Sequence, residues 1–197
     1  ASALGPEEQD AHAGSAGRPV VNVETTILDE TNTPVPPGTV GEIAHRSAHL
    51  MLGYLDDADK TAEAFAGGWF HSGDLGFYDE HGLLHVVDRK KDMIKTGGEW
   101  ISSVELENTV MSNPTIAEAA VVGVPDEKWG ESVKAVVTLE GEVSDADLIA
   151  FARERLAAYK CPKTIDFVDD MPRNPTGKIL KKELRKPYWE GRDRATV

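Results

Sequence analysis

Three short segments of the sequence place ionisable side chains where turns would expose them to a ligand. In the first, Asp74 follows Gly73 and lies two residues before Gly76, after an aromatic pair typical of a strand. Glycine lets the backbone turn tightly, so we expect the carboxylate to stay exposed. A carboxylate in that position can accept hydrogen bonds from both hydroxyl groups of a ribose. Gly-Asp is also common in turns that bind nothing.

The second segment is a run of charge at residues 88–92, which includes Arg89 and is followed by a glycine pair at 97–98 in a pattern typical of a hairpin turn. The third segment, residues 172–178, is stiffened by two prolines and a glycine and ends on Lys178. A lysine is a point charge on a flexible stem, which suits an anionic phosphate or carboxylate. Taken alone, each segment also fits a surface turn or a solvated run of charge.

The elements that must position these segments fall into two groups. Residues 1–18 are rich in Ala, Gly and acidic residues and show no period, which predicts a loop. Between residues 19 and 88, alternation of apolar and polar residues broken by turn signals predicts a β-rich unit. Its strands are expected at 21–27, 41–46 and 83–87, with a short helix at 57–65.

After residue 92 the pattern changes to alternating helices and strands, which indicates an α/β module. Ser102 with Glu105 three residues later is a capping box, and it predicts a helix over 103–112. Ser144 caps a second helix, whose apolar face extends to Tyr159. Strands are expected at 116–124, 133–139 and 164–168.

Composition narrows the class of protein. The chain has 197 residues, 40% of them hydrophobic, a formal net charge of −13 and one cysteine, Cys161. The acidic balance argues against nucleic-acid binding. The lone cysteine cannot form an intrachain disulfide, which makes the cytoplasm the default location. No apolar run is long enough for a transmembrane segment, and the histidines lack the spacing of a zinc site, so we expect no metal ligands in this chain.

The charge is unevenly distributed, because the tail from Lys160 onward has 10 Lys and Arg residues against 6 Asp and Glu residues. A basic tail suits contact with phosphate groups, and it equally suits a solvated helical end.

In this order and spacing, the segments together resemble the acyl-adenylate-forming superfamily, and in particular its acyl-CoA synthetases. The resemblance covers nearly the whole chain. It rests on blocks at residues 14–19, 41–43 with 51–54, 72–75, 88–95 with 97–99, and 175–178. Residues 98–103 and 187–189 are most similar to fatty-acid-CoA ligases and related enzymes.

This resemblance implies a fold of β and α/β class. The β-rich subdomain at 19–88 would be the end of a large N-terminal domain, and a hinge at 89–92 would join it to a small α/β C-terminal lid domain at 93–197. Asp74 would hold the ribose of ATP, and Arg89 would make a second contact to the ribose or a phosphate.

The remaining implied roles belong to the lid. Lys91 would be the pivot of its rotation, and Lys178 would be the catalytic lysine of adenylation. Gly97 and Gly98 would line the tunnel for the pantetheine of CoA, and Trp129 would contact the nucleotide of CoA. Trp129 also fits an aromatic side chain that only packs a loop.

The implied reaction converts a carboxylic acid, of fatty-acid type, to acyl-AMP with ATP and Mg²⁺, and then to acyl-CoA with CoA. The family's phosphate loop and the Thr-Glu motif that holds Mg²⁺ have no counterpart here. We therefore expect an N-terminal domain of the same protein to supply them, and expect this chain alone to be inactive. The alternatives are an adenylation domain that loads a carrier protein and a non-catalytic interaction module. A purely structural β-domain accounts only for residues 19–88.

Overall fold

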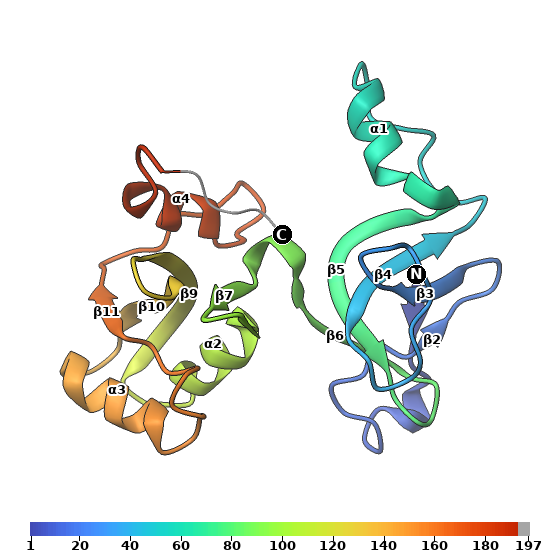
Figure 1. Ribbon diagram of the computed structural model, residues 1–197. Coiled ribbons are helices and arrows are strands. Elements are labelled where there is room, and N and C mark those ends of the chain that lie inside the picture. The colour runs from blue at the N-terminus through green and yellow to red at the C-terminus, as the bar shows by residue number, and fades with distance from the viewer. Residues whose placement is uncertain (193–197) are drawn as a thin grey trace. The chain divides into compact units, whose positions relative to one another are not determined.

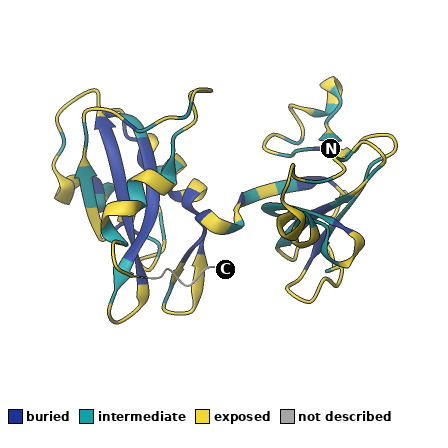
Figure 2. Ribbon diagram, turned by 90° about the horizontal axis from the view of Figure 1, so that it is seen from above, coloured by how far each residue is buried: buried dark blue, intermediate teal, exposed yellow. Residues whose placement is uncertain are grey.

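The chain divides into two compact units, Ala1–Lys90 and Lys91–Val197. The computed structural model describes residues 1–192, so the last five residues of the expected lid domain lie outside the description. The division falls within a single 3₁₀ turn, η3 (Lys90–Asp92). Each unit has its own sheet and its own buried core (Figures 1 and 2).

A four-stranded antiparallel sheet forms the first unit, with neighbouring strands following one another in the sequence. The strands are β3 (Glu24–Leu28), β4 (Gly41–Arg46), β5 (Phe70–Tyr78) and β6 (Leu84–Arg89). Helix α1 (Ala58–Ala64) and the 3₁₀ turn η2 (Ala66–Gly68) lie between β4 and β5 (Figure 1). Asp57 caps α1 by accepting a hydrogen bond from the Lys60 amide at 2.9 Å. The expected strand at 41–46 is confirmed, whereas the strand expected at 21–27 begins three residues later.

The N-terminal segment, expected to be a loop, is largely irregular but contains one short ladder. Strand β1 (Ser2–Ala3) pairs with β2 (Arg18–Pro19), and the 3₁₀ turn η1 (Pro6–Glu8) lies between them. Gly17 permits this pairing because its φ is +83° and a β-carbon there would lie 2.0 Å from the Ala3 carbonyl oxygen. Two-residue strands have no detectable period, so the sequence pattern could not predict them.

The segment around Asp74 differs from the expected turn. Residues 73 and 74 lie inside β5, a nine-residue strand, and not at its end. The chain bends there because Gly73 has a φ of +74° and the register with β6 shifts between Leu75 and Gly76. The glycines therefore produce a bulged strand instead of a reversal of the chain.

A mixed sheet of five strands forms the second unit. Its order is β11-β10-β7-β8, and β9 pairs with β10. The strands are β7 (Ile94–Thr96), β8 (Glu99–Ile101), β9 (Ile116–Asp126), β10 (Gly130–Leu139) and β11 (Thr164–Phe167). Strands β10 and β11 are parallel, and the connection between them contains a helix. The helices are α2 (Ser103–Met111), α3 (Asp145–Arg153), α4 (Lys181–Arg185) and the 3₁₀ turn η4 (Lys186–Tyr188).

Alternate residues of β9 and β10 point to opposite faces of this sheet. Both faces are covered by other parts of the second unit. One face packs on α2 and α3. The opposite face, with Ala120 and Val136, packs on Met171, Ile179 and Leu184 of the C-terminal segment. Figure 2 shows the two long strands largely buried. The core of the first face contains Leu106, Val110, Val121, Val133, Val137 and Leu148.

The caps of α2 and α3 are confirmed, since the Ser102 and Ser144 hydroxyls accept hydrogen bonds from the Glu105 and Asp147 amides. Helix α3 is shorter than expected, because it ends at Arg153. Tyr159 therefore lies outside the helix and is exposed. Among residues 1–192 no helix is long and apolar enough to cross a membrane.

Candidate functional site

Asp74 and Arg89 lie on adjacent strands of the first unit. They are paired in the register of β5 and β6, and Arg89 Nε is 3.9 Å from Asp74 Oδ1. Their side chains are 45% and 55% exposed, respectively, so both remain available to a ligand. The structure thus brings together two residues that sequence analysis assigned to one nucleotide from separate motifs. A carboxylate beside a guanidinium can accept hydrogen bonds from hydroxyl groups while the cation attracts a phosphate.

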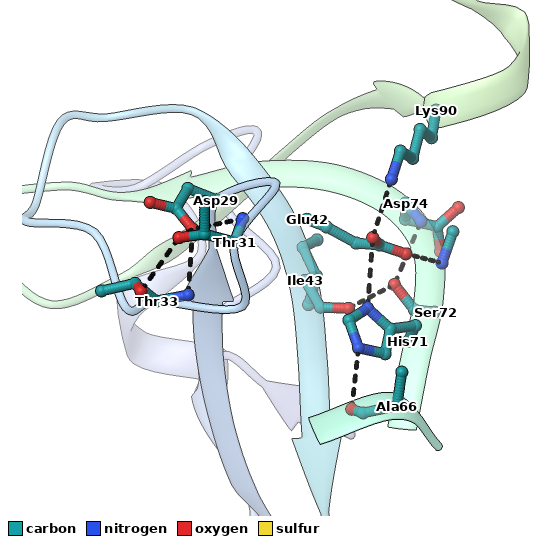
Figure 3. A network of polar contacts seen from close by, with 11 residues as sticks. Asp29, Thr31, Thr33, Glu42, Ile43, Ala66, His71, Ser72, Asp74 and Lys90 are labelled. Carbon is teal, nitrogen blue, oxygen red and sulfur yellow. Dashed lines mark hydrogen bonds and ion pairs between the residues drawn. The ribbon is translucent and has the colours of Figure 1, made fainter. Parts of the chain in front are cut away.

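Glu42 of β4 holds the bulged segment that carries Asp74 (Figure 3). Its Oε1 atom accepts a hydrogen bond from the Gly73 amide at 3.1 Å. Its Oε2 atom lies 3.2 Å from both His71 Nδ1 and Lys90 Nζ. Burial by itself raises the pKa of Glu42, but the hydrogen bond of His71 and the charge of Lys90 outweigh it, so the pKa lies below its usual value.

Ser72 completes this support. Its hydroxyl donates to the Ile43 carbonyl at 2.7 Å and accepts from the Asp74 amide at 3.0 Å (Figure 3). Sequence analysis assigned no role to Glu42 or His71. The signal available was an acidic residue at the second position of a predicted strand, because a charge that becomes buried in a strand needs a partner.

The hairpin of β7 and β8 presents the glycine pair. Gly97 and Gly98 have φ values of +59° and +92°, which favour glycine at both positions. The Gly97 amide donates to the Trp129 carbonyl at 3.0 Å. A β-carbon at Gly97 would lie 2.9 Å from Trp129 Cε3, so the indole ring packs directly on the hairpin. Trp129 is 44% exposed, and the ammonium group of Lys128 lies 4.4 Å from its ring centre.

Lys178 ends a tightly hydrogen-bonded loop. The Oδ1 atom of Asn174 accepts from the amides of Thr176 and Lys178 at 3.0 and 2.9 Å. Gly177 has a φ of +84°, and Arg173 donates to its carbonyl at 2.9 Å. The Lys178 backbone is therefore fixed while the residue is exposed. This combination fixes the base of the lysine side chain, while its flexible stem can carry the charge to an anionic ligand.

The hinge candidate Lys91 is exposed and is the first residue of the second unit. Gly97, Gly98, Trp129 and Lys178 also belong to the second unit, whereas Asp74 and Arg89 belong to the first. Within residues 1–192 no group of three or more His, Cys, Asp or Glu side chains is placed to hold a metal ion.

Comparison with known proteins relates both units to one enzyme family. The model of the AMP-binding enzyme family matches residues 1–55, and the model of the AMP-binding enzyme C-terminal domain matches residues 105–178. A long-chain-fatty-acid–CoA ligase of Escherichia coli O6:H1 is 42% identical over 183 residues, which is 92% of this chain and 33% of that protein. A 2-succinylbenzoate–CoA ligase of Bacillus mycoides is 42% identical over 173 residues, which is 88% of this chain and 36% of that protein.

A solved structure agrees with these relatives. The o-succinylbenzoate CoA synthetase of Bacillus subtilis, in complex with its acyl-adenylate intermediate, has a TM-score of 0.87 and 37% sequence identity. The match covers 92% of this chain and 37% of that chain. The chain therefore belongs to the family of AMP-binding enzymes whose members include the CoA ligases. It spans about a third of the length of the curated relatives that it matches.

Proposed function

We propose that this chain is the C-terminal part of an ATP-dependent ligase that converts a carboxylic acid to acyl-AMP and then to acyl-CoA. The observation that carries the proposal is the pairing of Asp74 with Arg89 on β5 and β6, with both side chains about half exposed. In the proposed site, Asp74 accepts hydrogen bonds from the ribose hydroxyls of ATP. Arg89 contacts the ribose or a phosphate, and Glu42 keeps the strand that carries Asp74 in its bulged form.

The first half-reaction joins two anions, since the substrate carboxylate attacks the α-phosphorus of ATP and pyrophosphate leaves. Lys178 stabilises this step by its charge, lying between the carboxylate and the nucleotide. A base is not needed, because the carboxylate is already ionised at neutral pH. The hydrogen bonds of Asn174 support this role by fixing the lysine backbone before the substrates arrive.

In the second half-reaction the thiol of CoA attacks the acyl carbonyl, and AMP leaves. We propose that the second unit rotates about Lys91 between the two steps, which removes Lys178 and brings in the Gly97–Gly98 hairpin. Glycines without β-carbons leave room for the pantetheine chain. We assign the contact to the nucleotide part of CoA to Trp129, which packs on Gly97.

A fatty acid is the proposed substrate, because residues 98–103 and 187–189 resemble fatty-acid ligases and a relative bears that name. A second relative is named for 2-succinylbenzoate, so an aromatic carboxylate is the competing substrate class. We expect the ligands of Mg²⁺ and the phosphate loop to come from an N-terminal part of the same protein. Cys161, the one cysteine, fits a cytoplasmic site of action.

The direct experiment separates the two half-reactions in the full-length protein. Pyrophosphate release is measured with ATP and either palmitate or 2-succinylbenzoate, and the fate of the acyl group is followed by mass spectrometry after CoA is added. We expect pyrophosphate release with one of the acids and an acyl-CoA product. The 197-residue chain alone is expected to release no pyrophosphate.

Two outcomes would contradict the proposal in different ways. Transfer of the acyl group to a phosphopantetheinyl carrier protein, with no transfer to CoA, identifies the carrier-loading alternative. Failure of the full-length protein to bind ATP identifies the interaction-module alternative.

A further inference from the structure

Arg185, in the short C-terminal helix α4, reaches back to the first residues of the second unit. Its Nη1 atom donates to the Lys91 carbonyl at 2.9 Å and to Asp92 Oδ1 at 3.1 Å. The two side chains of this ion pair are 13% and 10% exposed. One guanidinium nitrogen thus holds both the backbone carbonyl of Lys91, the expected hinge residue, and the side chain of Asp92. Being shielded from water, this contact is stronger than an exposed ion pair of the same geometry.

Helix α4 is itself fastened to the rest of the second unit, so it is a firm support for Arg185. Lys181, its first residue, lies 2.7 Å from both the Ser103 hydroxyl and the Glu107 carboxylate. Beyond the helix, Trp189 Nε1 donates to the Gly123 carbonyl of β9 at 3.0 Å. Leu184 packs against the buried cluster of Ala120, Val136 and Met171.

The residues before Lys91 are fastened to the first unit instead. Arg89 belongs to the β5–β6 ladder, and its amide donates to the Asp88 carboxylate at 2.7 Å. Lys90 pairs with Glu42 at 3.2 Å. Each unit therefore holds its own end of the connecting backbone, because the first unit holds Lys90 and the second holds the Lys91 carbonyl.

We propose that Arg185 is a positioning residue that confines the hinge to Lys91. By holding the Lys91 carbonyl and Asp92, it makes both move with α4 as one body, so the rotation is limited to the backbone between Lys90 and the Lys91 carbonyl. Helix α4 begins three residues after Lys178. Arg185 thereby also ties the adenylation loop to the same body. This inference rests on the proposed function for its catalytic consequence, but not for its structural one.

The structural consequence is tested by hydrogen exchange on the full-length protein without substrates. Arg185→Gln should raise the exchange rates of the amides near residues 91–93 by about tenfold or more, because it removes the charged donor that holds the Lys91 carbonyl and Asp92. Trp189→Phe is the matched control, because it removes one hydrogen bond of the tail and leaves the hinge contact intact. Equal exchange near residues 91–93 in Arg185→Gln and wild type would overturn the proposal, and so would a uniform increase across the second unit.

The catalytic consequence is tested by a rescue. Lys91→Pro is expected to block thioester formation, because proline restricts the backbone torsions between Lys90 and the Lys91 carbonyl. If Arg185 confines the hinge, adding Arg185→Gln to Lys91→Pro releases the backbone torsions that follow the Lys91 carbonyl. Thioester formation should then be roughly tenfold faster than in Lys91→Pro alone, a coupling of the size seen for neighbouring residues. A merely structural role for Arg185 makes the double variant worse than the single one, and that result would refute the proposal. Absence of thioester in the wild-type protein would instead refute the proposed function, and the exchange experiment would still decide the role of Arg185.

Discussion

Arg89 lies directly opposite Asp74 in the antiparallel register of β5 and β6, with 3.9 Å between Arg89 Nε and Asp74 Oδ1. The pair is exposed and long, so it contributes at most about 1 kcal/mol to stability. Because the pair gains the fold so little, its exposed side chains support the nucleotide-binding role that we propose for them.

Asp74→Ala should weaken the use of ATP without unfolding the protein. Loss of the hydrogen bonds that the ribose hydroxyls donate to this charged acceptor is expected to raise the KM for ATP by about 10-fold to 100-fold. The melting temperature should change little, because the ion pair is exposed. Initial rates at varied ATP and a thermal melt of the full-length protein provide both readouts. A large fall in melting temperature at unchanged KM would assign Asp74 to the fold.

Lys178→Ala should lower acyl-AMP formation by roughly 10²-fold or more, since it removes one preorganised charge. Thioester formation from supplied acyl-AMP and CoA should be nearly unchanged, because Lys178 is proposed to leave the site before that step. Lys182→Ala, which removes an exposed cation of α4, is the matched control. Equal losses in both half-reactions would show that Lys178 acts in both steps or supports the fold.

Lys91→Pro in the full-length protein should retain acyl-AMP formation and lose thioester formation by orders of magnitude. Proline holds φ near roughly −65° and removes an N–H group, so a rotation that uses this residue is blocked. Lys91→Ala leaves φ and ψ free and should affect both half-reactions only mildly. Thioester synthesis at a near-normal rate in the proline variant would place the pivot elsewhere.

Gly97→Ala should displace Trp129 and raise the KM for CoA. The new β-carbon would lie 2.9 Å from Trp129 Cε3, and the φ of +59° adds about 1–2 kcal/mol of backbone strain for alanine. At Gly98 a β-carbon meets nothing within 4 Å, so Gly98→Ala adds backbone strain at a φ of +92° but should not displace Trp129. In a Trp129→Ala background, Gly97→Ala should lower the free energy of unfolding by less, and a double-mutant cycle measures this difference. Additive costs would show that the indole ring does not pack on Gly97 in solution.

Asp79 should make the first unit sensitive to acid. The backbone amide of Leu83 and the ring of His85 hold the pKa of Asp79 at about 2, below its usual 3.8. A lowered pKa stabilises the fold above pH 3.8, and this contribution is lost as the pH falls toward about 2. As the pH falls across this interval, the melting temperature should drop more steeply for the wild-type protein than for Asp79→Asn. Parallel curves would contradict the role of Asp79.

Local features of the sequence were sufficient to predict several elements. The serine caps at Ser102 and Ser144 specify where α2 and α3 begin, because a side chain close in sequence satisfies the first amides of each helix. The strand at 41–46 is expected as a short run after the turn residues of 29–38, and the structure has it there. The ordered motifs also indicated the family, and the comparisons confirm it.

The tertiary structure decided what depends on partners distant in the sequence. Gly73 and Asp74 form a bulged strand and not a turn, because pairing with β4 and β6 outweighs the local preference of a Gly-Asp pair. Glu42 supports the site through an amide 31 residues away. Arg185 contacts Lys91, the proposed hinge residue 94 positions before it, and a contact at that sequence separation leaves no period or motif in the sequence. Sequence patterns record which residues neighbour one another along a helix or strand, whereas the packing of the sheets determines which motifs meet.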